Sequence, residues 1–198
     1  MKATSALAEP QPVLDFWFGA EGSTEFGTQR KAWFKKEPDF DQAIADRFGA
    51  TIEQALRGEL DAWAATAPGA LARILLLDQF TRNVFRGERR AFAGDAQALA
   101  GASAMVGSRL DEQLPPFMRA FAYMPFEHAE GLAMQDEAVR LFTRLEAAAP
   151  ELGHMLDYAY RHRAVIERFG RFPSRNASLG RQSTAEEIAH LAEPGSRF

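Results

Sequence analysis

Arginine is concentrated in one stretch of the chain, and guanidinium is the side-chain group best suited to binding carboxylates and phosphates. Residues Tyr160–Arg181 read YRHRAVIERFGRFPSRNASLGR, with Glu167 as the single acidic residue. The arginines of this stretch are Arg161, Arg163, Arg168, Arg171, Arg175 and Arg181. Because phenylalanine and proline lie between them, the stretch differs from a solvated basic tail. It predicts rigidly held guanidinium groups that face either internal carboxylates or an anionic ligand.

The segment RFGRFPSRN at Arg168–Asn176 predicts a helix end followed by a rigid turn. We expect Gly170 to adopt the left-handed conformation that closes a helix, and Pro173 to fix an extended turn. Arg175 and Asn176 then offer compact hydrogen-bond donors. Donors clustered after a helix end can hold a carboxylate or a phosphate.

The same arginines can equally have a structural function inside the protein. They can bond the last carbonyl groups of helices and pair with acidic residues elsewhere in the chain. The acidic candidates are Asp78, Glu127 and Glu130. We expect a mixture, in which a structural network has an outer edge that lines a pocket.

A second group of polar residues lies in the predicted helix Gly69–Arg86, whose first half is almost entirely apolar. At about 100° per residue, the polar positions of its second half fall within about 140° of one another. These positions are Asp78, Gln79, Arg82, Asn83 and Arg86. Asp78 and Arg82 have the spacing of a favourable intrahelical ion pair. The pattern is typical of a helix end that lines a cleft, or of one that reaches the protein surface.

Acid–base chemistry is suggested by Glu127, His128 and Glu130, which follow the helix-distorting Pro125. We expect Glu127 and Glu130, three residues apart, to share one helical face. Their spacing does not match the helical metal motifs that combine histidine and glutamate, so we predict no metal site. The alternative is a solvated acidic turn, or salt bridges to the arginine-rich stretch.

His162 is the remaining acid–base candidate. It projects from the middle of the apolar face of the helix predicted at Glu151–Phe169, with Arg163 near the edge of that face. A histidine in such a position is more often a core residue with satisfied hydrogen bonds than a catalyst.

These residues must be positioned by helices, because helical periodicity runs through nearly every long segment and no alternating strand is visible. We expect an all-α protein of about eight or nine helices joined by short loops, in a single domain over residues 1–198, with 1–11 loosely ordered. Successive helices should be antiparallel neighbours, in a stacked array or a compact bundle. The predicted helices are Val13–Phe18, Thr28–Lys36, one capped by Asp39 with Gln42 in a capping box, Gly69–Arg86, one capped by Asp95 and ending near Val106, one beginning near Phe117 with a kink at Pro125, Asp136–Ala148, Glu151–Phe169, and one capped by Ser183 with Glu186.

Composition limits the classes of function. The net charge of −4 argues against nucleic acid as the main partner. The chain has no cysteine, which excludes disulfides, thiolate metal sites and a cysteine nucleophile. No apolar run is long enough for a membrane span and the N-terminus is a poor signal peptide, so we expect a cytoplasmic protein without membrane contact. We predict no cofactor. Oligomeric state stays open, because the aromatic residues near the termini (Phe16, Trp17, Phe18 and Phe198) can pack within the chain or at a dimer contact.

Four segments carry a resemblance to a known family. They are VLDFWFG (Val13–Gly19), LLLDQFTRNVFRG (Leu75–Gly87), YMPFEHAE (Tyr123–Glu130) and HRAVIERFGRFPSRNASLGRQST (His162–Thr184). In order and spacing they resemble the uncharacterised bacterial domain-of-unknown-function family 924, across almost the whole chain. The resemblance implies a tetratricopeptide-repeat-like α–α superhelix and implies no activity. That family usually has histidine at the position of Ser174, and serine favours holding an anion over transferring a proton.

Three hypotheses follow. The first is a binding protein that holds an anionic small molecule or an acidic peptide in an arginine-lined cleft; its ligand-binding candidates are Asp78, Arg82, Asn83, Arg86, Arg171, Arg175 and Asn176. The second is a hydrolase or lyase acting on an anionic metabolite; its acid–base candidates are Glu127, His128, Glu130 and His162. The third is a polar network that is purely structural.

Overall fold

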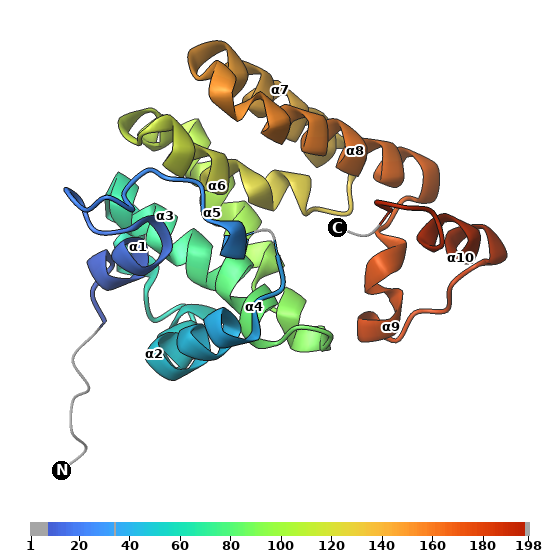
Figure 1. The fold of residues 1–198 in the computed structure, drawn as a ribbon, viewed down its shortest axis with the longest axis horizontal. Coiled ribbons are helices and arrows are strands. Elements are labelled where there is room, and N and C mark those ends of the chain that lie inside the picture. The colour runs from blue at the N-terminus through green and yellow to red at the C-terminus, as the bar shows by residue number, and fades with distance from the viewer. Residues whose placement is uncertain (1–7, 34, 197–198) are drawn as a thin grey trace.

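The computed structural model describes residues 8–33 and 35–196, and within these residues the protein is all-helical, as predicted. Figure 1 shows α7 and α8 running side by side along one edge, with α6 next to them and the first helices at the far end of the molecule. The α-helices are α1 (Gln11–Phe18), α2 (Pro38–Leu56), α3 (Ala67–Leu75), α4 (Thr81–Val84), α5 (Asp95–Gly107), α6 (Pro116–Glu127), α7 (Leu132–Ala148), α8 (Gly153–Phe169), α9 (Asn176–Leu179) and α10 (Ala185–Leu191).

Aromatic side chains fill the main core where α1 packs against α2. Trp17 and Phe18 are completely buried, and Phe16 stacks on Phe40 at 5.1 Å between ring centroids. The aromatic residues of α1 therefore pack inside the chain. Phe198 lies outside the described residues, as do residues 1–7 of the segment 1–11; the chain enters α1 at Gln11.

The prediction of a helix from Thr28 to Lys36 is wrong for the described residues of that segment. These residues contain only a 3-10 turn, Lys31–Trp33. Tertiary contacts explain the difference. The indole Nε1 of Trp33 donates to the carbonyl oxygen of Trp17 at 3.0 Å, and the Trp33 ring lies 4.9 Å from that of Phe121. These contacts fix the aromatic side chain against the core, where helical propensity has little weight.

Three predicted N-caps are displaced. The helix α2 begins at Pro38, whose ring presets the first helical position, so Asp39 lies inside the first turn. Asp95 is the first residue of α5 and follows Gly94. The last capping box is formed by Thr184 and Glu187, one residue after the predicted pair, because the S/T-x-x-E pattern fits both registers.

The predicted helix Gly69–Arg86 is present but interrupted. A π-helical segment, Leu76–Phe80, lies between α3 and α4. Gly94 packs directly against it: a β-carbon at position 94 would lie 2.2 Å from the carbonyl oxygen of Leu77. A glycine is therefore required there for α5 to approach this segment closely.

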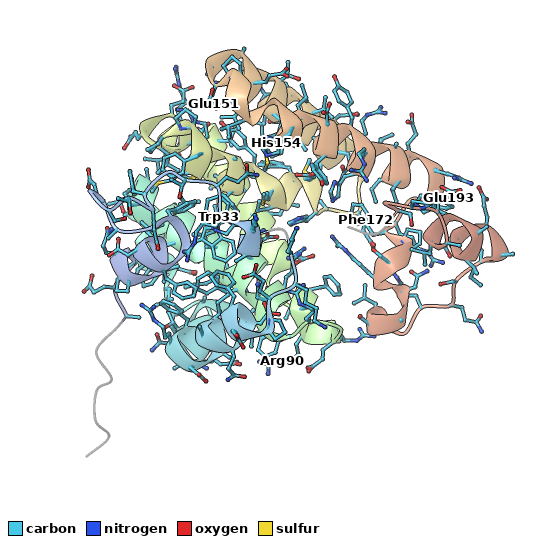
Figure 2. All side chains as sticks on the ribbon, viewed as in Figure 1. Trp33, Arg90, Glu151, His154, Phe172 and Glu193 are labelled. Atoms are coloured by element: carbon cyan, nitrogen blue, oxygen red, sulfur yellow. The ribbon has the colours of Figure 1, made fainter. Side chains whose placement is uncertain are left out.

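The chain after α8 forms a unit that we call the C-terminal arm, residues 170–191. Gly170 ends α8 in the left-handed conformation, with φ 67° and ψ 2°, as predicted. The 3-10 turn Pro173–Arg175, α9 and α10 follow. Figure 1 shows α9 and α10 at the opposite side from α1. Phe172, labelled in Figure 2, lies where the arm begins and is 2% exposed.

Candidate functional site

Asp78 lies in the π-helical segment and is buried, with 1% exposure. Its carboxylate accepts from Gln79 Nε2 at 2.6 Å and lies 3.0 Å from Nη1 of Arg82, the ion pair that the sequence predicts. Burial alone would raise the pKa of Asp78, but the Arg82 charge, together with His128 and Gln79, holds this pKa well below its usual range. Asp78 is therefore ionised at neutral pH.

Arg82 joins Asp78 to a second carboxylate. Its guanidinium donates to both oxygens of Asp95, at 2.9 and 3.1 Å, and also to the backbone carbonyl of Asp78 at 2.8 Å. This bidentate pair is the favoured geometry for arginine and a carboxylate. The donors of Arg82 are consequently committed to internal partners.

His128 is the C-cap residue of α6, and its ring faces Asp78. The distance from His128 Nδ1 to Asp78 Oδ1 is 2.8 Å. Burial disfavours the imidazolium form and lowers the pKa of His128, against the attraction of Asp78. A neutral histidine in this position donates Nδ1–H to the carboxylate.

Arg175 differs from Arg82 in its surroundings and in its hydrogen-bond partners. Its guanidinium lies over two aromatic rings, 5.0 Å from the centroid of Phe92 and 4.4 Å from that of Phe172. Among the described residues, its one hydrogen bond goes to Asp95 Oδ2, at 3.4 Å. Burial, and then repulsion from Arg82, lowers the pKa of Arg175 to about 10, so the group is still charged at neutral pH.

These groups meet at a cavity of about 370 Å³, which we call the Arg175 cavity. It lies between the π-helical segment, α5, the end of α6 and the C-terminal arm. Its polar lining residues are Asp78, Asp95, His128, Glu130 and Arg175. Its apolar lining residues are Phe92, Ala96, Leu99, Pro125, Ala129 and Leu179. A mostly apolar wall with a few convergent polar groups is typical of a small-molecule site.

Asn83 and Arg86 do not join this cavity. Asn83 Nδ2 donates to Asp41 at 2.7 Å, and Arg86 donates to both oxygens of the same carboxylate at 3.0 Å. They line a separate hollow of about 420 Å³ beside α2. The extra residue of a π turn shifts all later positions around the helix, so the predicted polar strip is divided into two sites.

Arg171 and Asn176 belong to a third cluster, inside the C-terminal arm. Arg171 donates to both oxygens of Glu187 at 2.6 and 2.9 Å, and Asn176 donates to the same carboxylate at 3.3 Å. Arg181 donates to both oxygens of Glu130, at 2.6 and 2.9 Å. We call these five residues the arm network. It matches the internal function considered for the arginines.

Glu127 and Glu130 do not share a helical face, contrary to the prediction, because α6 ends at Glu127. Glu127 is buried and lies 2.7 Å from Nδ1 of His162. His162 is buried as well, and the same nitrogen lies 2.9 Å from the carbonyl oxygen of Tyr158. Glu130 instead lies in the turn after α6, where it also accepts from the backbone amide of Phe172 at 2.7 Å.

Two lining residues of the Arg175 cavity that contact Arg175 itself were not recognised in the sequence as part of a site. Asp95 was expected only as a helix cap, and Phe92 carried no signal because it lies in a short 3-10 turn, Arg89–Phe92. Within the described residues, no group of three or more histidine, aspartate and glutamate side chains is arranged to hold a metal ion. In the same residues, no helix has the length and apolar character needed to cross a membrane.

The chain belongs to a bacterial protein family. Residues 13–195 match the family model described as "Bacterial protein of unknown function (DUF924)", as the sequence resemblance indicated. The structure is similar to that of a protein of unknown function, ATU0120 from Agrobacterium tumefaciens, with a TM-score of 0.81 and 38% sequence identity. The similarity covers 92% of this chain and 96% of the other. No curated protein matches the sequence.

Proposed function

We propose that the Arg175 cavity binds a small molecule that carries a carboxylate or a phosphate group. The observation that carries this proposal is how few of its hydrogen-bond donors the Arg175 guanidinium uses. It offers five N–H donors, yet with the residues that the structure describes it makes one long hydrogen bond, to a carboxylate already engaged by Arg82. A buried cation with unused donors is stabilised by an anion that enters the cavity.

The two aromatic rings support the same proposal. The Arg175 guanidinium packs over the rings of both Phe92 and Phe172, which reduces the loss of side-chain entropy when an anion binds. Phe172 is in turn fixed by its backbone amide, which donates to Glu130. Arg175 is thus preorganised by neighbours that need no ligand of their own.

The acidic residues around the cavity do not oppose this function as strongly as their number suggests. Asp95 accepts two hydrogen bonds from Arg82, and Glu130 accepts two from Arg181. Asp78 faces both Arg82 and His128. Each carboxylate therefore has a cationic or hydrogen-bonding partner, and Arg175 is the lining group with donors to spare.

Ligand binding is tested by thermal unfolding with inorganic phosphate and with benzoate, each compared with sodium chloride at equal ionic strength. A ligand at ten times its Kd stabilises the folded state by about 1.4 kcal/mol, which raises the midpoint by about 3–6 °C. Comparing the two anions separates a phosphate site from a carboxylate site. A short aspartate-rich peptide tests the alternative ligand, an acidic peptide end.

The variant Arg175→Met should lose this stabilisation, because methionine fills the space between the rings without offering donors. Arg168→Met is the matched control, since Arg168 is about half exposed and pairs with Glu186 on the surface. If neither anion shifts the midpoint, or if Arg175→Met responds as the wild type does, the proposed site is wrong. A response to the peptide alone contradicts the small-molecule version. The predicted tetratricopeptide-repeat-like superhelix and the cytoplasmic location remain part of this proposal.

A further inference from the structure

The Asp78–His128 pair has the arrangement of a histidine base oriented by a carboxylate. Asp78 is buried and ionised, and it accepts the Nδ1–H of His128 at 2.8 Å. Gln79 fixes the other carboxylate oxygen at 2.6 Å. This hydrogen bond selects one tautomer, in which Nε2 of His128 carries the lone pair.

Nε2 of His128 is available to a ligand. The residue lines the Arg175 cavity, and no hydrogen bond joins Nε2 to any of the described residues. Among the described residues, this atom is not one of the buried side-chain atoms without a partner, so it is accessible to solvent. A neutral imidazole in this position can accept a proton from a group held in the cavity.

The charges around His128 keep it neutral until it reacts. Arg82 and burial disfavour the imidazolium form, whereas Asp78 and Glu127 favour it. His162 lies 6.1 Å away between ring centroids. Asp95, Glu130 and Arg175 are the other charged residues that line the cavity with Asp78 and His128. The result is a base that is unprotonated at neutral pH and faces a carboxylate able to stabilise the imidazolium once formed.

We propose that Asp78 and His128 form a general-base pair that activates water against a small anionic ester held by Arg175. This inference rests on the proposed anion site and adds a reaction to it. The other acids of the cavity are engaged by arginines. Burial alone would raise the pKa of Glu130, but hydrogen bonds from Arg181 and the Phe172 amide outweigh burial and lower this pKa. His128 is thus the cavity group suited to moving a proton, and ester hydrolysis needs one base and a held substrate.

Ester hydrolysis at this pair needs water and no further reactant. Water loses a proton to Nε2 of His128 while its oxygen bonds to the ester carbonyl carbon. The carbon–oxygen bond to the alcohol then breaks, and the imidazolium returns its proton to the leaving oxygen. Asp78 stays ionised throughout and acts as the positioning residue. Ser174 is not among the residues that line the cavity, so this base does not depend on it.

The test substrate is 4-acetoxybenzoate, whose para carboxylate cannot assist its own hydrolysis, and the neutral control is its methyl ester. We expect the wild type to favour the anionic ester by about tenfold or more in kcat/KM, since one hydrogen-bonded charge supplies about that factor. His128→Gln should lower kcat about 10²–10⁴-fold. Arg175→Met should raise KM and remove the preference for the anionic ester.

Measurements on the wild type keep the test valid if His128→Gln fails to fold. The rate should fall as the pH decreases through a single ionisation below 6.5, the ordinary value for histidine, and should be lower in D2O than in water. No hydrolysis above the protein-free rate, or full activity in folded His128→Gln, overturns the inference. If benzoate still binds in that case, the anion site stands and the base pair alone is rejected.

Discussion

Arg171 and Arg175 lie four residues apart in the C-terminal arm, yet their guanidinium groups are used in opposite ways. Arg171 donates to both oxygens of Glu187 and to the carbonyl oxygen of Gln182. Arg175 lies over two aromatic rings and makes one hydrogen bond, of 3.4 Å, with the residues that the structure describes. The donors of the first arginine go to internal acceptors, whereas the second keeps donors that no acceptor in the described part of the chain uses.

The difference comes from the carboxylates that each arginine meets. Glu187 is fixed by the capping box of α10 and is turned toward Arg171 and Asn176. Asp95, the nearest acid to Arg175, is already held in a bidentate pair by Arg82. Basic charge in a sequence therefore does not locate a ligand site by itself. The balance of donors and acceptors around each arginine does.

The largest effect should come from removing Arg181, which belongs to the arm network. Arg181→Ala removes both hydrogen bonds to Glu130 and those to Asn176 Oδ1 and the Phe172 carbonyl. It also leaves the partly buried Glu130 carboxylate with fewer partners. We expect a loss of about 3 kcal/mol in the free energy of unfolding, measured by urea denaturation.

Arg168→Ala is the control for that loss, because Arg168 and Glu186 form an ion pair with both side chains about half exposed. Such a pair contributes about 0–1 kcal/mol. Equal losses in the two variants would show that the arm network is no more important than a surface pair. The contrast between structural and ligand-facing arginines would then have no basis in stability.

The second effect is on acid stability. Hydrogen bonds from Arg171 and from the Thr184 amide, opposed by burial, lower the pKa of Glu187 to about 2 from its ordinary 4.5. The folded state therefore binds this proton less tightly than the unfolded state does. The stabilisation from Glu187 is fully present above pH 4.5 and is lost as the pH falls toward about 2.

We expect the thermal midpoint to fall over that pH range, and to fall less in Glu187→Gln. The neighbouring Glu186→Gln serves as the control, because the Glu186 side chain is 63% exposed. Differential scanning calorimetry at several pH values between 5 and 2 measures the difference. Parallel curves for the wild type and Glu187→Gln would contradict the assignment of Glu187 to the arm network.

The all-α class and the later helices could be predicted because periodicity and helix-ending residues such as Gly170 act locally. The failures have non-local causes. The segment near Trp33 is shaped by contacts with Trp17 and Phe121. The π-helical segment packs closely against Gly94, a contact that no window of the sequence reveals.

The candidate site was predictable in its residues and not in its grouping. Asp78, His128 and Arg175 were all singled out by type and spacing. Their meeting at one cavity, and the departure of Asn83 and Arg86 to Asp41, depend on how helices far apart in the chain pack. The role of Asp95 was the hardest to predict. Aspartate is common at the start of a helix, so its presence there gives no sign of a partner elsewhere in the chain.

The smallest effect on stability should come from Arg175, although this variant should have the largest effect on binding. Its pKa is lowered to about 10 because burial and Arg82 disfavour its charge, so removing the charge relieves an unfavourable term. Arg175→Met loses the contacts with Phe92 and Phe172 as cation–π pairs but keeps hydrophobic packing there. We expect the free energy of unfolding to change by less than about 1 kcal/mol in either direction, measured by urea denaturation without added anions. A loss of about 3 kcal/mol, like that expected for Arg181→Ala, would mean that Arg175 is a structural residue. A structural arginine cannot give both a small change in the free energy of unfolding and a loss of stabilisation by anions. Removing a structural arginine lowers stability whether or not a ligand is present.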